Sequence, residues 1–210
     1  PLPPSFTQLP IGTIIIVALR SDFFLKEADI YRETVWNTVR NYPNLIFKII
    51  TKRVERIKEC LPKDWGDGWE NVIIAATVEN QKRVSERLPI FLNLPLKHRW
   101  LACTPLLEEI DLTPYLSTNK IEHVEVNGEK SYKQEQIRPL KISWVKNLRQ
   151  QCVSNDVRLS FLFVGSHCIL DDDSIISDNC MCYHSEVADS LNISYYKPIS
   201  FKLKDKEIVY

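Results

Sequence analysis

The segment NVIIAATVENQKRVSER, residues 71–87, decides how the rest of the chain is interpreted. It opens with the apolar run Val72–Ala76, which is rich in β-branched residues and too short for a helix of ordinary length. Such a run is typical of a strand that is buried on both faces of a parallel sheet. Asn80 follows as a favourable helix N-cap, and Val84 and Leu88 lie four residues apart on one face of the expected helix. The segment therefore predicts one strand–helix unit.

Similar apolar runs recur along the chain at intervals of roughly thirty residues, the usual length of a strand–helix repeat. The expected strands are Thr13–Leu19, Leu45–Ile50, Val72–Ala76, Arg99–Cys103, Ile121–Val126 and Arg158–Val164. Helices are expected over Glu27–Arg40, Val54–Cys60 and Lys141–Cys152, in addition to the one that begins after Asn80. In the first of these helices, the buried stripe is expected to be Ala28, Tyr31, Val35 and Val39. Pro89 is expected to open a second short helical piece, since proline is well tolerated in a first turn.

The alternation of strands and helices predicts an α/β fold with a parallel sheet, because short right-handed crossovers permit little else. An open doubly wound sheet and a barrel both fit the alternation. The sequence has neither GxGxxG nor GxxxxGK[ST], the phosphate-binding motifs of nucleotide folds. This favours a partial parallel (β/α)6 barrel over residues 1–170. Residues 171–210, with a helix expected over Tyr183–Leu191 and a hairpin-like segment over Phe201–Tyr210, are expected to be a C-terminal extension packed on the barrel.

The composition excludes several classes of protein. Lys plus Arg and Asp plus Glu number 27 each, so the net charge does not attract the chain to nucleic acid or to an anionic membrane. No apolar run approaches the length of a membrane span. The six cysteines are scattered without a CxxC pair, which is typical of reduced thiols in a cytoplasmic protein. The chain does not begin with Met, so a fragment or a processed product is expected.

The carboxyl ends of the expected strands carry polar residues, and in parallel α/β folds these ends are where ligands bind. Charged groups near a core are costly without partners, so either they pair with one another or they serve a ligand. We expect a small-molecule ligand rather than a membrane or a nucleic acid, and the sequence does not indicate whether a protein partner exists. The candidate binding residues are Asp22, Thr51, Lys52, Arg53, Glu79, Asn80, Gly128 and Glu129.

Two weaker signals lie near the C-terminus. Five potential soft ligands occur within eighteen positions: His167, Cys168, Cys180, Cys182 and His184. Zinc prefers four such ligands in a tetrahedron, but the CxC spacing is not a zinc knuckle, so we expect buried thiols and no metal. Ser166 lies outside a GxSxG pattern and is not expected to be a nucleophile.

Several motifs together resemble one family. They are Ser21-Asp22-Phe23, Thr51-Lys52-Arg53, Asp64-Trp65-Gly66-Asp67-Gly68, Thr77-Val78-Glu79-Asn80-Gln81, Arg87-Leu88-Pro89, Cys103-Thr104-Pro105-Leu106-Leu107 with Asp111, and Arg149-Gln150-Gln151-Cys152. In order and spacing, they resemble the phage "gp thirty-seven/gp sixty-eight" family of unknown function, whose core is radical-SAM-like. The resemblance extends over about residues 11–170.

The resemblance implies a barrel that binds S-adenosylmethionine beside a [4Fe–4S] cluster. Asp22, Glu79 and Asn80 would contact the amino-acid and ribose groups, and Lys52 and Arg53 would face a carboxylate or phosphate. Gly128 would allow the backbone to approach the cofactor closely. In the family, a CxxxCxxC-type motif near the N-terminus holds the cluster, whose iron supplies an electron to the sulfonium. This chain has no such motif, so a cluster is expected only if a missing N-terminal segment supplies the cysteines.

The chain departs from the family pattern at three strand ends. Asn127-Gly128-Glu129-Lys130 stands where the family has Gly-Gly-Glu-Ser, Cys103-Thr104-Pro105 lacks a carboxylate, and Phe163-Val164 replaces a polar edge. These departures leave two hypotheses open. The chain is either the core of a divergent radical-SAM-like protein that binds S-adenosylmethionine or a related small ligand, or a degenerate, non-catalytic barrel that acts as a binding or scaffolding protein.

Overall fold

The protein is described by a computed structural model that covers residues 8–130, 137–177, 185–204 and 206–210. The chain divides into two compact units. The first unit comprises Pro1–Ala76, Ile90–Arg99 and Pro198–Tyr210, and the second comprises Thr77–Pro89 and Trp100–Lys197. The expected division into a barrel over 1–170 and an extension over 171–210 stays a prediction.

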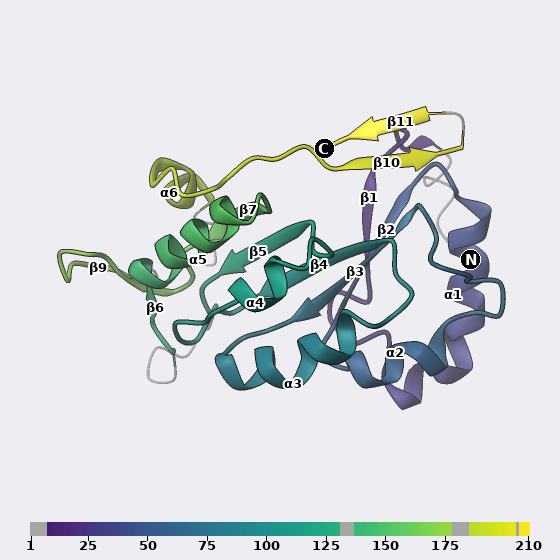
Figure 1. The fold of residues 1–210 in the computed structure, drawn as a ribbon, viewed down its shortest axis with the longest axis horizontal. Coiled ribbons are helices and arrows are strands. Elements are labelled where there is room, and N and C mark those ends of the chain that lie inside the picture. Colours follow the sequence, from purple (N-terminus) through teal and green to yellow (C-terminus); the bar gives the residue numbers. More distant parts are fainter. Residues whose placement is uncertain (1–7, 131–136, 178–184, 205) are drawn as a thin grey trace. The chain divides into compact units, whose positions relative to one another are not determined.

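The predicted α/β class and parallel sheet are confirmed (Figure 1). Six strands follow one another in the sheet in chain order, and their described pairings are parallel. This order is that of a (β/α) barrel rather than of a doubly wound sheet. Among the described strands, the first and the last are the two edges of the sheet, which therefore corresponds to part of a barrel. The strands are β1 (Ile14–Val17), β2 (Ile46–Thr51), β3 (Val72–Thr77), β4 (His98–Cys103), β5 (His123–Asn127) and β7 (Arg158–Phe163).

The predicted helices over residues 54–60 and 141–152 and the one after Asn80 are present, and two short helical segments that the sequence did not predict occur as well. They are η2 (Lys26–Ala28), α1 (Asp29–Asn41), α2 (Val54–Cys60), α3 (Gln81–Phe91), α4 (Thr113–Leu116), α5 (Ile142–Ser154) and α6 (Ser185–Ser190). The predicted break at Pro89 is wrong, because α3 continues through it as one helix. Pro89 lies in the last turn of α3, where a missing N–H removes only the bond to the carbonyl four residues earlier and disturbs little of the helix.

The buried face of α1 shares only Val39 with the predicted stripe, because Ala28 and Val35 are half-buried and Tyr31 is exposed. Tyr31, which was expected in the core, is 66% exposed, and its neighbour Arg32 is only 7% exposed. Arg32, Trp36 and Val39 form the buried face instead. The apolar periodicity predicts the wrong face because it counts only apolar residues. The Arg32 guanidinium is buried because it donates to three oxygens of the chain.

The core of the first unit is built on strands that are buried on both faces. All six residues of β3 are buried, as the run of β-branched and small residues predicts. Beside it, Trp36, Trp65 and Trp69 form an aromatic cluster with ring centroids 5.2 to 5.7 Å apart. The C-terminal hairpin of β10 (Ser200–Leu203) and β11 (Lys206–Val209) also belongs to this unit and confirms the predicted hairpin-like segment.

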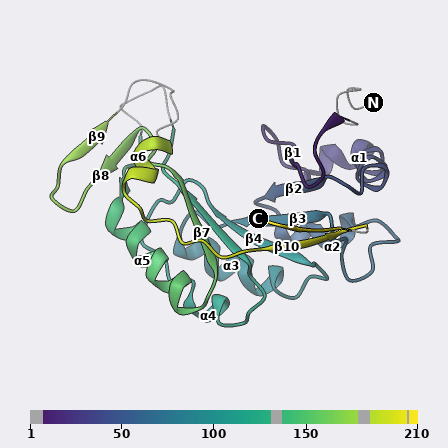
Figure 2. The same cartoon turned by 90° about the horizontal axis from the view of Figure 1, so that it is seen from above.

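In the second unit, α5 packs against β7 and buries Ile142, Val145, Leu148 and Cys152, which lie on one stripe of the helix (Figure 2). A three-stranded sheet follows that the sequence did not predict. It consists of β6 (Leu140–Lys141), β8 (His167–Ile169) and β9 (Ile175–Ser177), which are too short to produce a period-two pattern. Among the described residues, no helix combines the length and the apolar character that a membrane-crossing segment requires.

Candidate functional site

In the first unit, one carboxylate connects the carboxyl ends of β1 and β2. Oδ1 of Asp22 accepts hydrogen bonds from the Phe24 N–H at 2.9 Å and the Thr51 hydroxyl at 2.8 Å. Oδ2 accepts from the Lys52 N–H at 2.9 Å and the Arg53 guanidinium at 3.0 Å. Burial opposes ionisation, but these donors outweigh it and hold the pKa of Asp22 below its ordinary value. Because both oxygens are engaged, Asp22 braces the two strand ends.

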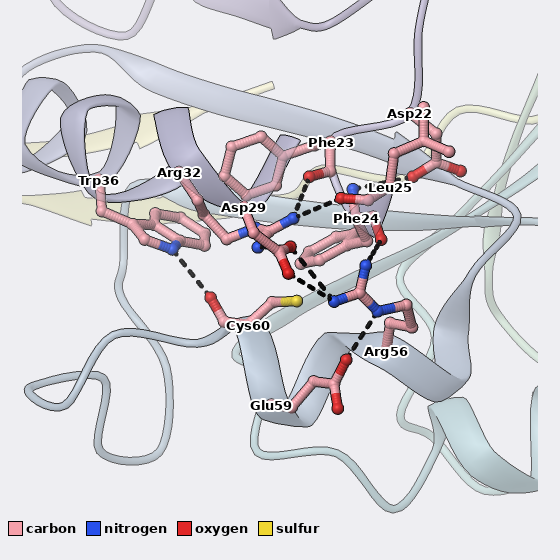
Figure 3. Close-up of polar contacts among 10 residues, drawn as sticks. All are labelled: Asp22, Phe23, Phe24, Leu25, Asp29, Arg32, Trp36, Arg56, Glu59 and Cys60. Atoms are coloured by element: carbon pink, nitrogen blue, oxygen red, sulfur yellow. Dashed lines mark hydrogen bonds and ion pairs between the residues drawn. The ribbon is translucent and has the colours of Figure 1, made fainter. Parts of the chain in front are cut away.

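The loop after Asp22 is held by two arginines from the helices beside it (Figure 3). Arg32 of α1 donates to the first and third carbonyls of residues 23–25 at 3.0 and 2.9 Å. Arg56 of α2 donates to the second at 3.0 Å. Both guanidinium groups also pair with Asp29, Arg56 through contacts of 3.1 and 3.2 Å. The loop's carbonyl groups are thereby satisfied without regular secondary structure.

In the second unit, the end of β3 carries a buried ion pair. Arg87 of α3 donates to Oε2 of Glu79 at 2.6 Å and to the carbonyl of Thr77 at 2.6 Å. The two side chains are only 12% and 11% exposed, so removing either would leave the other charge buried without its partner. Asn80 caps α3 by accepting from the Arg83 N–H at 3.0 Å, which confirms the predicted N-cap.

The end of β5 carries a second, more accessible pair. The backbone N–H and Nε of Arg138 donate to Oε2 of Glu129 at 2.9 and 3.0 Å, and a terminal nitrogen donates to Oε1. This guanidinium holds the pKa of Glu129 below its ordinary value in spite of partial burial. Glu129 in turn raises the pKa of Arg138, and the charge of Glu79 adds to the effect. The Arg138 side chain is 57% exposed and that of Glu129 is 20% exposed.

Glycines allow the ends of β5 and β7 to approach each other. A Cβ at Gly128 would lie 2.2 Å from the carbonyl oxygen of Val164. A Cβ at Gly165, where φ is +81°, would lie 2.7 Å from the carbonyl oxygen of Glu129. The N–H of Ser166 donates to that same oxygen at 2.8 Å. The close backbone approach at Gly128 is therefore made by the chain itself.

Two glutamines from the motifs hold the segment 110–112. Oε1 of Gln81 accepts from the N–H of Asp111 at 2.7 Å, and its Nε2 donates to the carbonyl of that residue at 3.5 Å. Oε1 of Gln151, on α5, accepts from the N–H of Leu112 at 2.7 Å. These motif residues therefore position a loop.

A row of polar side chains lies in the middle of β5 and the strands beside it. The sequence did not predict these side chains as site residues, because they do not lie at the carboxyl ends of strands. Nε2 of His123 is 2.8 Å from the Ser160 hydroxyl, and its ring centroid is 4.4 Å from that of Trp100. Glu125 pairs with Ser160 in register and is 7% exposed. Because His123 and Trp100 are also only 4% exposed, these side chains belong to the interior of the unit.

The predicted site residues fall into two sets. Asp22, Thr51, Lys52 and Arg53 form one hydrogen-bonded group in the first unit. In the second unit, Glu79 and Asn80 follow the end of β3, Gly128 and Glu129 follow the end of β5, and the charges of both carboxylates act on Arg138. Arg32, Arg56 and Arg138 could not be predicted from the sequence as site residues, because each lies away from a strand end and carries no distinctive local signal.

The described cysteines do not fit an iron–sulfur cluster. Cys60, Cys103, Cys152 and Cys168 are free and buried. Burial raises the pKa of each thiol, to about 12 for Cys152 and about 11 for Cys168, whereas cluster ligands are thiolates. In the described part of the chain, no three Cys, His, Asp or Glu side chains converge as a metal site. Cys180, Cys182 and His184 lie outside the described residues.

The fold and these contacts define an α/β protein with an open parallel sheet whose strand ends carry carboxylate–guanidinium pairs. Residues 7–205 match the family described as protein of unknown function (DUF5131), and the chain belongs to that family. No curated protein and no solved structure matches the chain.

Proposed function

We propose that the second unit binds a small zwitterionic ligand at the carboxyl ends of its parallel strands. S-adenosylmethionine, which the resemblance to the phage "gp thirty-seven/gp sixty-eight" family implies, is the ligand we propose. The observation that carries the proposal is the accessible Glu129–Arg138 pair at the end of β5, whose guanidinium also experiences the charge of Glu79. Ligands of parallel α/β folds bind at this edge of the sheet.

The charges of this pair match those of the ligand's methionyl group. Arg138 offers a planar fork that fits a carboxylate through two hydrogen bonds. Glu129 offers an acceptor for the α-ammonium group. The oxygen of Asn80 is used by its cap, so a ribose contact would use the amide nitrogen.

The exposure of the pair makes an exchange of partners inexpensive. Because the Arg138 side chain is 57% exposed, it can turn to an opposite charge on a ligand at a cost on the order of 1 kcal/mol. The buried pair of Glu79 and Arg87 would remain closed, because opening it would uncover charges that are about nine-tenths buried. The Glu129–Arg138 pair would contact the ligand, and the Glu79–Arg87 pair would hold the chain after β3 in place.

The proposal is restricted to binding. Cleavage of S-adenosylmethionine requires an electron that a [4Fe–4S] cluster supplies when bound, and the described thiols do not fit such a cluster. The same observation favours the second candidate function, a non-catalytic binding or scaffolding protein.

Isothermal titration calorimetry with S-adenosylmethionine tests the proposal. We expect saturable 1:1 binding that weakens about tenfold in Arg138→Gln, since one lost charge-assisted contact corresponds to about 1.4 kcal/mol. Lys146→Gln is the matched control, because it removes a cation from another exposed pair of the same unit, that with Asp171. Absence of binding at millimolar ligand, or an equal loss in both variants, would refute the proposal.

A further inference from the structure

The first unit contains a charged cavity that none of the proposed strand-end contacts uses. It has a volume of about 510 Å³ and is lined by residues of η2, α1 and α2; its lining residues other than Lys26 are drawn in Figure 3. Its lining is almost entirely ionisable, with a thiol as the remaining group. The lining residues are Lys26, Asp29, Arg32, Arg56, Glu59 and Cys60.

The lining has three cations and two carboxylates, an excess of one positive charge. The carboxylates already have partners: Asp29 pairs with both arginines, and Glu59 pairs with Nε of Arg56 at 2.6 Å. Lys26 makes no ion pair with any residue in the part of the chain that the structure describes. The unbalanced charge therefore belongs to Lys26, at the rim of the cavity.

The buried wall of the cavity also has unused hydrogen-bonding capacity. Arg32 is 93% buried, as its 7% exposure implies, and its Nε has no acceptor among the described residues. Its two terminal nitrogens make three hydrogen bonds to protein oxygens, out of the five N–H donors of a guanidinium. The positive charge of this guanidinium is therefore only partly offset by acceptors of the chain, which favours a negative group in the cavity beside it.

We propose that this cavity binds a small oxyanion, the phosphoryl or carboxyl group of a metabolite. Its negative charge balances the excess cation of the lining, and Lys26 closes over it from the rim. The arginines remain in the clamp that holds residues 23–25, so the loop is already in place when the anion binds. Such preorganisation lowers the entropic cost of binding.

The proposal is tested by titrating the full chain with inorganic phosphate and, separately, with succinate, at constant ionic strength set with chloride. The indole N–H resonance of Trp36 is the local readout, because Nε1 donates to the Cys60 carbonyl at 3.0 Å beside the cavity. Trp36→Phe assigns this resonance. We expect a saturable shift of the Trp36 signal with one of the two anions, and the anion that gives it identifies the group that the cavity prefers.

The matched variants are Lys26→Glu and Lys58→Glu. Both reverse one exposed lysine, but Lys58, on the same helix as Arg56 and Glu59, does not line the cavity. We expect at least a tenfold loss of anion affinity in Lys26→Glu and less than a twofold change in Lys58→Glu. The proposal is falsified if neither anion gives a saturable shift or if the two variants lose affinity equally. Trp100 and Trp144 belong to the second unit, so a shift confined to them would report the other site.

Discussion

The two units use acidic residues at their strand ends in different ways. In the first unit, Asp22 accepts four hydrogen bonds from its own chain, and its side chain is 12% exposed. In the second, Glu129 is held by a single residue, Arg138, whose side chain is 57% exposed. The same position in a parallel sheet therefore carries a structural brace in one unit and an exchangeable pair in the other. A polar strand end indicates a ligand site only where its partners are accessible.

The largest effect that this difference predicts is on stability. Asp22→Ala leaves the Thr51 hydroxyl and two backbone N–H groups without their acceptor, so we expect a loss of about 3 kcal/mol in the free energy of unfolding. Urea denaturation followed by circular dichroism measures it. Asp171→Ala, which removes the partner of exposed Lys146, should cost less than about 0.5 kcal/mol. Similar losses in the two variants would mean that Asp22 is not a brace.

A second prediction concerns the close approach of β5 and β7 in the second unit. Gly128→Ala places a Cβ 2.2 Å from a backbone oxygen, so the strand ends must separate, and we expect a cost of about 2 to 3 kcal/mol. The control is Gly66→Ala in the first unit, where φ is +57° but no atom lies within 4 Å of the added Cβ. Strain alone should cost about 1 kcal/mol there. Equal thermal shifts in the two variants would contradict the packing role of Gly128.

A third prediction concerns the fall in the free energy of unfolding at acidic pH. The hydrogen bonds to Asp22 depress its pKa below the ordinary value of 3.8, so the folded state binds the proton less readily than the unfolded state. Its contribution is complete above pH 3.8 and is lost as the pH falls through the depressed value. Asp22→Asn should therefore show a smaller fall in the urea midpoint between pH 5 and pH 3 than the unaltered chain. An identical fall in both would exclude Asp22 as a source of acid sensitivity.

How far the sequence predicts the structure depends on the range of the forces involved. The bounds of α2, the Asn80 cap and the buried β3 follow from local pattern, and the structure confirms them. The burial of Arg32 does not follow from local pattern. Its guanidinium donates to carbonyls seven and nine residues earlier, and the spacing of apolar residues carries no information about such hydrogen bonds. The same holds for Arg138, whose partner Glu129 lies nine residues earlier in a loop.

The candidate site shows the same division. Strand-end position correctly brought Asp22, Thr51, Lys52 and Arg53 together, because the ends of paired parallel strands share an edge. It could not distinguish a carboxylate saturated by its own chain from one with an accessible partner, because that depends on how many donors converge in space. The cavity in the first unit was missed for this reason, since it is lined by helices rather than by strand ends.

The smallest stability effect, and the sharpest functional one, is expected at the accessible pair. Glu129→Gln keeps the size and one acceptor oxygen of the side chain but removes the charge, so the free energy of unfolding should change by less than about 1 kcal/mol. Affinity for S-adenosylmethionine should nevertheless fall about tenfold, because the ligand's ammonium group loses its carboxylate. Asp22→Asn should do the reverse, lowering stability while leaving that affinity within twofold. If Glu129→Gln instead lowers stability as much as Asp22→Ala does, Glu129 is a second brace, and the proposed exchange of its partner for a ligand is wrong.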